Sequence, residues 1–289
     1  MLESENLEAL VIATPPVEHF DIVAAGIDNN LHIYCEKPFC LNTSEAVELC
    51  ALSHKKKIYA VGFQFRFEVL IAKMKSLIAS GVIGKTISID FSWITSGRSD
   101  PGRSWSWQND DSSGGGVINS FASHMIDLIY WLSGQSITSI VSMQKSILIS
   151  ERLDTRHIYR NVTAEDFVKA EFILGKDIKT SLEATNCSVN STGMRITISG
   201  QNGILEYRSV FPFGPKEASL ALVRSGSFNQ EFSTEQLEID YQGDSRLLSV
   251  GKIMSAFEES IISGYLSQDL PGFADGLAIH RVLDQMKSY

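Results

Sequence analysis

The segment 34–38, with the sequence YCEKP, combines the residue types that a proton-transfer site needs. It includes the end of the apolar run 31–34, which predicts a short buried strand. Pro38 lacks an N–H group and disfavours helical geometry at Lys37, so we expect Lys37 at the carboxyl end of that strand. Ligands of open α/β sheets bind at this end. An amine there can donate a proton to a reacting oxygen, with Glu36 holding it in place. On these five residues alone, a surface ion pair is the simpler interpretation.

A second group of chemically capable residues follows the triple glycine 114–116. Apolar residues at helical spacing between 118 and 132 predict a helix. On that helix Ser120, His124 and Asp127 are four and three residues apart, which places them on one face. A hydroxyl, an imidazole and a carboxylate on one face suit acid–base chemistry, although a packed structural histidine is an equally good interpretation.

The stretch before the glycines, residues 96–116, is polar and has no periodicity. Loops of this length inside a domain are usually functional or disordered. Trp105 and Trp107 argue against disorder, so we expect this loop to be functional.

The elements that must position these residues fall into two groups. Strands at 7–14, 31–34 and 58–61 alternate with helices at 17–27 and 43–54, which predicts a parallel βαβαβ half-sheet. Strands dominate from residue 86 onward, at 86–93, 137–150, 165–174, 178–186, 194–199 and 203–207, with helices at 69–80, 253–263 and 273–286. Their alternating pattern predicts a mostly antiparallel sheet with one solvated face. Residues 214–232 show no decisive pattern.

The predicted fold class is therefore α/β plus α+β. The C-terminal half of a parallel Rossmann-type sheet precedes a large, mostly antiparallel open-sheet domain. We place the domains at 1–62 and 63–289. A dinucleotide-binding domain has two such halves, and its first carries G-x-G-x-x-G. That motif does not occur in the sequence, so we expect the first half of the domain to be missing and the strand at 7–14 to form an open sheet edge.

Composition excludes several classes of partner. The net charge is −9 and no Lys/Arg run occurs, which argues against nucleic acid and anionic membrane surfaces. No apolar run reaches the roughly 20 residues of a membrane span, and the first ten residues carry no signal-peptide pattern. Cys35, Cys40, Cys50 and Cys187 match no zinc spacing. We expect a cytoplasmic protein with reduced thiols and no metal site.

Five motifs occur in a fixed order: an ATPP turn at 13–16, the Glu-Lys-Pro strand end, G-x-x-x-R-F at 62–67, a Gly-x-x-Gly-Lys turn at 81–85, and GGG-x₇-H-x-x-D at 114–127. This set resembles the Gfo/Idh/MocA oxidoreductases, named for glucose-fructose oxidoreductase and inositol dehydrogenase. The resemblance implies a Rossmann domain that binds NAD or NADP and hydride transfer between nicotinamide and a sugar or polyol hydroxyl carbon. It also implies a homo-oligomer, a dimer or tetramer, formed through the open sheet.

The resemblance also assigns roles to residues of this sequence. The implied catalytic residues are Lys37, His124 and Ser120, with His124 as the general acid/base. The implied cofactor-binding residues are Thr14, Pro15, Pro16, His19, Glu36, Lys37 and Arg66. The implied substrate-binding residues are Arg103, Trp105, Asn119 and Asp127.

Two departures from the family pattern leave an alternative open. Many members carry Asp where this chain has Ser120, and a serine cannot hold a charge, so the proton relay loses a carboxylate. The glycine loop that binds the pyrophosphate also has no counterpart. The alternative is therefore a truncated, catalytically silent relative that acts as a binding or oligomerisation module.

Overall fold

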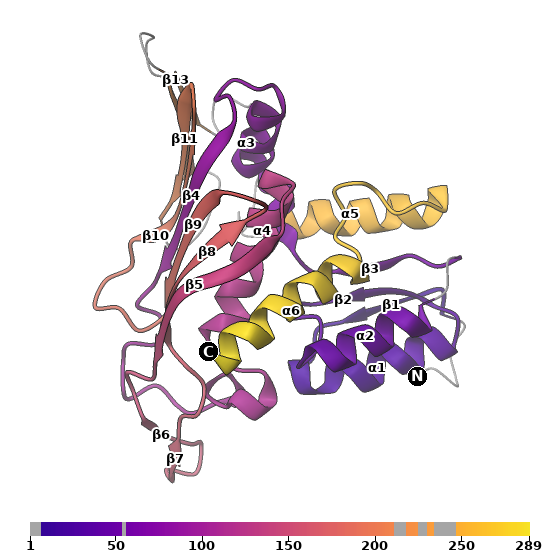
Figure 1. Cartoon of the computed structure of the whole chain (residues 1–289). Coiled ribbons are helices and arrows are strands. Elements are labelled where there is room, and N and C mark those ends of the chain that lie inside the picture. The colour runs from indigo at the N-terminus through magenta and orange to yellow at the C-terminus, as the bar shows by residue number, and fades with distance from the viewer. Residues whose placement is uncertain (1–6, 54–55, 211–217, 225–229, 234–246) are drawn as a thin grey trace.

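The computed structural model describes residues 7–53, 56–210, 218–224, 230–233 and 247–289. Two sheets lie on either side of the C-terminal helix α6 (Figure 1). The smaller, sheet A, has the strand order β1-β2-β3, and the larger, sheet B, has the order β13-β12-β11-β10-β4-β9-β8-β5. The predicted fold class, a parallel sheet followed by a large and mostly antiparallel one, is confirmed.

Sheet A is parallel throughout, as the alternation of strands and helices predicted. Its elements, in chain order, are β1 (Ala9–Ile12), α1 (His19–Asp28), β2 (His32–Cys35), α2 (Thr43–Leu52) and β3 (Tyr59–Val61), with a 3₁₀ turn at Pro16–Glu18. The side chain of Asn42 caps α2 by accepting a hydrogen bond from the Glu45 N–H at 3.0 Å. Short connections of this kind place the carboxyl ends of the strands at one edge.

The two C-terminal helices pack against sheet A. α5 (Leu247–Ser263) lies on the opposite side of sheet A from α1 and α2 (Figure 1), and its Phe257 packs in a cluster with Tyr34 of β2 and Ala60 of β3. α6 (Phe273–Ser288) contacts both α2 and β3. The backbone N–H of Val61 donates to the carbonyl of Pro271, just before α6, at 2.9 Å. The proposed division at residue 62 stays a prediction.

Sheet B contains β4 (Thr86–Ile94), β5 (Ile137–Ser146), β8 (Phe167–Leu174), β9 (Ile178–Thr185), β10 (Gly193–Gly200), β11 (Gly203–Ser209), β12 (Ala218–Arg224) and β13 (Gln230–Ser233). The central pair β4 and β9 is parallel and the remaining pairs are antiparallel. Burial alternates along β8 and β9, so the apolar face packs inward and the other face is open to solvent.

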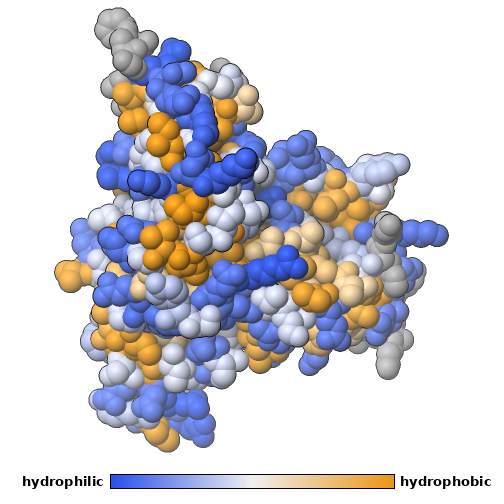
Figure 2. All heavy atoms as spheres, in the orientation of Figure 1, coloured by the Kyte–Doolittle hydropathy of each residue, from blue (hydrophilic) through white to orange (hydrophobic). Residues whose placement is uncertain are grey.

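Two helices, α3 (Val69–Ala79) and α4 (Ser123–Ser133), lie on the side of sheet B that faces sheet A (Figure 1). The solvated face carries ion pairs between neighbouring strands, such as Lys169–Glu183 at 2.9 Å. Hydrophobic and hydrophilic residues are interspersed on the side of the molecule drawn in Figure 2. No helix within the described ranges is both long enough and apolar enough to span a bilayer.

Two parts of sheet B differ from the sequence prediction. The expected strand at 137–150 ends at Ser146, and a hairpin of β6 (Glu151–Leu153) and β7 (Tyr159–Asn161) follows it. The stretch 214–232, which had no decisive pattern, contains β12 and part of β13, and its other residues lie outside the described ranges. β6 and β7 have three residues each and form a separate two-stranded sheet, so their local sequence signal is weak.

Candidate active site

A cavity of about 310 Å³ lies where the carboxyl ends of strands from both sheets meet. Lys37 reaches it from the end of β2 in sheet A, Thr95 follows β4, and Asn186 follows β9 in sheet B. The triple glycine 114–116 and Ser120 also line the cavity. The chain therefore brings together residues more than a hundred positions apart at the sheet edge where α/β proteins bind ligands.

Lys37 is half-buried in the cavity lining, as its position at the end of a strand predicted. Its Nζ donates a hydrogen bond to the backbone carbonyl of Ser120 at 2.8 Å. Burial lowers the pKa of Lys37 to about 8, although Glu36 beside it acts in the opposite direction. Burial raises the pKa of Glu36 itself, and Oε2 of Glu36 accepts a hydrogen bond from the Lys37 backbone N–H at 3.3 Å. The amine can therefore lose its proton close to neutral pH.

The ATPP turn at the end of β1 is held against the strand end that carries Lys37. The two ring nitrogens of His19 lie 2.9 Å from the carbonyl of Thr14 and 3.0 Å from the carbonyl of Pro38. His19 is fully buried, so it braces these two segments and does not line the cavity. Pro16 approaches Gly114, where an added Cβ would lie 2.7 Å from the Pro16 Cβ. Gly114 also has φ +81°, which disfavours any other residue.

A short π-helical segment at Ile118–Ala122 precedes α4. Such segments are rare and occur frequently at functional sites. Ser120 lies within it, lines the cavity, and donates its hydroxyl proton to the Gly116 carbonyl at 2.7 Å. The extra residue in the turn changes which side chains share a face. Ser120 therefore faces the cavity while Asp127 does not, in contrast to the common face that ideal spacing predicted.

His124 lies beneath the cavity and is 2 % exposed. Its ring packs against Phe65 at 4.6 Å and Phe63 at 5.8 Å between ring centroids, and lies 6.0 Å from Trp93. Burial, with a smaller effect from Lys37, lowers the pKa of His124 well below its usual value, so the ring is neutral. Its buried Nδ1 has no hydrogen-bond partner. The predicted catalytic pair is close in space, but only Lys37 lines the cavity.

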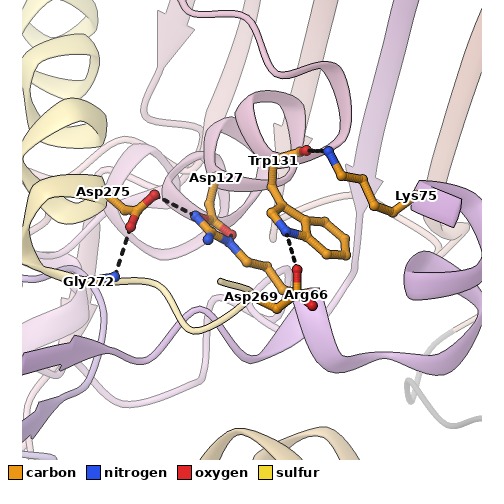
Figure 3. A network of polar contacts seen from close by, with 7 residues as sticks. All are labelled: Arg66, Lys75, Asp127, Trp131, Asp269, Gly272 and Asp275. Carbon is orange, nitrogen blue, oxygen red and sulfur yellow. Dashed lines mark hydrogen bonds and ion pairs between the residues drawn. The ribbon is translucent and has the colours of Figure 1, made fainter. Parts of the chain in front are cut away.

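Arg66 and Asp127 form a buried ion pair instead of lining the cavity (Figure 3). Both side chains are at most 4 % exposed, and the Arg66 guanidinium binds both carboxylate oxygens of Asp127 at 2.5–3.1 Å. Arg66 also bonds Asp275 at 3.0 Å, and Asp275 accepts from the Gly272 N–H at 2.8 Å. Arg66 was predicted to bind the cofactor and Asp127 the substrate. In this structure the two groups bind each other, because both would otherwise be buried charges.

The predicted substrate residues of the loop separate into two groups. Arg103 lines the cavity, whereas Trp105 lines a different hollow beside β7 and donates its Nε1–H to the Asn161 carbonyl at 3.1 Å. Asn119 is 1 % exposed and donates to the Gly115 carbonyl at 3.0 Å, which places it behind the cavity wall. Of the four residues predicted to bind substrate, Arg103 is the one in direct contact with the cavity.

Several lining residues were missed by sequence reasoning. Trp93, on β4, stacks on Phe121 with 4.1 Å between ring centroids and an angle of 13°, and both line the cavity. Arg98 and Trp107 line it from the loop. For Arg98 and Trp107 the sequence signal was their place in the aperiodic stretch 96–116, and nothing local says which side chains of a loop turn inward.

The described residues fit the nicotinamide end of a dinucleotide better than its phosphate end. The buried Oγ1 of Thr14, just after β1, has no hydrogen-bond partner among the described residues. Lys37 stands beside it at the end of β2. The sequence has no glycine-rich phosphate loop to match. Among the described residues, no group of three or more His, Cys, Asp or Glu side chains is arranged to hold a metal ion.

Two family models match the chain, and together they span most of its length. Residues 1–63 match the oxidoreductase family with an NAD-binding Rossmann fold, and residues 71–206 match the GFO/IDH/MocA C-terminal domain. The nicotinamide cofactor class expected from the sequence is thus confirmed as that of the matched family.

Curated relatives show the same affiliation. An uncharacterised oxidoreductase of Synechocystis sp. is 29 % identical over 209 residues, which are 71 % of this chain and 56 % of that protein. The levoglucosan dehydrogenase of Pseudarthrobacter phenanthrenivorans is 29 % identical over 154 residues, or 53 % of this chain and 39 % of that one. The chain thus spans little more than half the length of the Synechocystis relative and less than half that of the levoglucosan dehydrogenase.

Solved structures share the fold. Levoglucosan dehydrogenase in complex with NADH and levoglucosan superposes with a TM-score of 0.87 at 21 % identity, covering 99 % of this chain and 78 % of that one. An oxidoreductase domain protein from Kribbella flavida gives 0.87 at 22 % identity, with 99 % and 79 % covered. The ordered motifs, the two sheets and both family models agree, and the chain belongs to the Gfo/Idh/MocA oxidoreductase family.

Proposed function

We propose that the protein is an NAD(P)-dependent oxidoreductase that moves hydride between nicotinamide and a hydroxyl-bearing carbon of a sugar or polyol. The observation that carries the proposal is Lys37: a half-buried amine with a pKa near 8 in a cavity between the two sheets. A general acid/base works best when its pKa lies near the working pH.

The nicotinamide ring supplies the hydride donor or acceptor when it is bound. The protein's own residues handle the proton and the position of the substrate. Lys37 takes the substrate hydroxyl proton during oxidation and returns it during reduction. The Ser120 carbonyl, 2.8 Å from Nζ, holds the amine in place. The hydroxyl of Ser120 retains its acceptor capacity for a substrate O–H, because it donates its own proton to Gly116.

His124 remains a proposed acid/base residue. Its neutral ring is buried and does not line the cavity, and its Nδ1 has no hydrogen-bond partner. This nitrogen could exchange a proton with the cavity only after a local rearrangement of the side chains around it. In the proposal Lys37 is therefore the group that meets the substrate, and His124 supports it.

The names of relatives support the class of substrate. They include a levoglucosan dehydrogenase, an inositol 2-dehydrogenase of Streptomyces avermitilis that is 27 % identical over 145 residues, and a glucose-6-phosphate 3-dehydrogenase of Bacillus subtilis that is 22 % identical over 210 residues. Each name contains a sugar or a polyol. The three differ enough that the individual substrate is left to experiment.

The test begins with calorimetric titration of NAD⁺, NADH, NADP⁺ and NADPH into the 289-residue chain. We expect binding in the micromolar range for one cofactor pair, followed by reduction of the oxidised form when a panel of sugars and polyols is added. Lys37→Met should lower turnover roughly 10²- to 10⁴-fold while the cofactor still binds measurably. Lys179→Met, which changes an exposed lysine on β9, should leave both turnover and cofactor binding unchanged. Absence of binding at millimolar cofactor would refute the proposal and favour a silent binding or oligomerisation module.

A further inference from the structure

The charge of the cavity is not explained by hydride transfer alone. Three basic side chains line it, Lys37, Arg98 and Arg103, and none of its described lining residues is Asp or Glu. The whole chain, in contrast, carries a net charge of −9. A cavity with this composition concentrates positive potential within an acidic protein, and such a site attracts anions.

Arg98 and Arg103 both have guanidinium N–H donors that no described protein group accepts from. Neither takes part in an ion pair between described residues. Nη1 of Arg103 bonds the Gly97 carbonyl, and Nη1 of Arg98 is 3.5 Å from Oδ1 of Asn109. Asp100, the acidic residue between the two arginines in the sequence, is exposed and accepts a hydrogen bond from the Gly102 N–H at 2.8 Å. Since a guanidinium has five N–H donors, most of them are left for a ligand.

A third arginine holds the loop segment 98–103, which carries Arg98 and Arg103. Arg152, on β6, is 1 % exposed. Its guanidinium donates to the backbone carbonyls of Arg98 at 2.5 Å, Asp100 at 2.7 Å and Arg103 at 3.3 Å. A buried cation bonded to three carbonyls of one loop fixes the path of that loop. Arg152 is thus a positioning residue for the two arginines that line the cavity.

The three guanidinium groups also disfavour one another. Partial burial lowers the pKa of Arg98, and the nearby cations of Arg103 and Arg152 lower it further. An anion placed between Arg98 and Arg103 would relieve this repulsion. The loop is therefore arranged for a ligand that brings negative charge.

The lining of the cavity also includes aromatic residues. The stacked rings of Trp93 and Phe121, together with Trp107, line the same cavity. Flat aromatic surfaces provide the apolar part of a ligand site, and a few polar groups fix the orientation of the ligand. A cavity lined by both basic and aromatic side chains suits a ring-shaped polar molecule with one anionic substituent.

We propose that Arg98 and Arg103 form an anion subsite, so that the substrate is a sugar bearing a carboxylate or a phosphate group. The inference rests on the proposed function for the identity of the ligand as a sugar. It goes beyond that function by making the class of substrate anionic.

The test measures binding by quenching of tryptophan fluorescence, with and without NAD⁺, for three probes of similar size: D-glucose, D-glucuronate and D-glucose 6-phosphate. We expect at least one anionic sugar to bind roughly 10-fold or more tightly than glucose at low salt, since hydrogen bonds to charged groups are about twice as strong as neutral ones. The anion that binds better identifies carboxylate or phosphate as the natural group.

The variants Arg98→Gln and Arg103→Gln should each remove most of that preference, because each should weaken binding of the anionic sugar far more than binding of glucose. Arg156→Gln makes the same change of charge at the other hollow, beside β7, and should have no effect. Equal binding of charged and neutral sugars, or no binding of either anion at millimolar concentration, would overturn the inference. So would tighter binding of ADP that the same variants abolish, because the arginines would then hold the cofactor. Because binding is measured apart from turnover, failed hydride transfer leaves this result standing.

Discussion

Lys37 is the residue on which the proposed chemistry depends, and its titration can be tested directly. Its pKa is lowered to about 8, so the fraction of neutral amine rises between pH 7 and pH 9. Oxidation needs the neutral amine as a base, so kcat/KM for oxidation should rise with pH through about 8 and then level off. Reduction needs the protonated form, and its pH dependence should be reversed.

Lys37→Met should remove this inflection and lower kcat roughly 10²- to 10⁴-fold, the usual contribution of a positioned acid/base. The measurement is the pH dependence of kcat/KM for the wild-type protein and for Lys37→Met, at a saturating concentration of cofactor. A wild-type profile that is flat between pH 7 and pH 9, or an inflection that persists in Lys37→Met, would assign the proton to another group.

The sequence predicted some site residues because their position depends on local geometry. Lys37 follows a strand and precedes a proline, so its place at the sheet edge could be read from five residues. Trp105 and Asp127 were predicted to meet the substrate, and their side chains instead bind the Asn161 carbonyl and Arg66. Such partners lie about 60 positions away, and no local pattern shows them.

At the scale of elements, the Arg66–Asp127–Asp275 network joins the segment before α3 to α4 and α6 (Figure 3). Arg66→Met would leave Asp127 buried without a partner, which typically costs about 3–5 kcal/mol. Burial already raises the pKa of Asp127 to about 6, and loss of Arg66 would raise it further. When a carboxyl group has a higher pKa in the folded state than in the unfolded state, the folded protein loses stability as pH rises through that range. The Arg66→Met variant should therefore be least stable at alkaline pH.

Urea unfolding of Arg66→Met at pH 5 and pH 8 tests this. The double variant Arg66→Met/Asp127→Leu should recover most of the lost stability, because no buried charge remains. Arg208→Met removes an exposed pair with Glu206 and should change stability by less than about 0.5 kcal/mol. A double variant as unstable as the single one would mean that packing, not charge, sets the cost.

The contact between Gly114 and Pro16 couples the glycine turn to the ATPP turn of sheet A. Gly114→Ala should destabilise the protein by about 2–3 kcal/mol, since it combines a strained positive φ with a clash against Pro16. Weaker cofactor binding should accompany this loss, because Pro16 lies in the turn predicted to line the cofactor. Gly251→Ala in α5 meets no atom within 4 Å and should be neutral or slightly stabilising. Thermal unfolding of Gly114→Ala and Gly251→Ala measures how much the contact between Gly114 and Pro16 contributes to stability.

Element types followed from the sequence wherever periodicity was strong. The alternation in sheet A and the period-2 burial of β8 and β9 were predicted and are confirmed. The hairpin of β6 and β7 was not predicted, because strands of three residues are too short to show a periodic pattern. It carries Arg152, so the part of the fold that sequence patterns miss is also the part that holds the cavity loop.

At the scale of the whole molecule, the open question is how copies of the chain associate. Oligomerisation through the open face of sheet B stays a prediction. That face carries charged pairs such as Lys169–Glu183 and Arg195–Glu206, so an interface there would weaken as salt increases. The other open surface is β1, the terminal strand of sheet A, which pairs only with β2 among the described strands.

An exposed strand edge is a template for pairing with another chain, and Val11 in the middle of β1 is 54 % exposed. Val11→Lys should therefore reduce self-association measured by sedimentation velocity, because a charge on an edge strand opposes pairing. Val47→Lys is the matched control: Val47 is 46 % exposed but lies on α2, so the same charge there should leave association unchanged. If Val11→Lys associates as wild type does and high salt disperses both, the interface is the charged face of sheet B. A monomeric wild-type protein would show that neither surface pairs under those conditions.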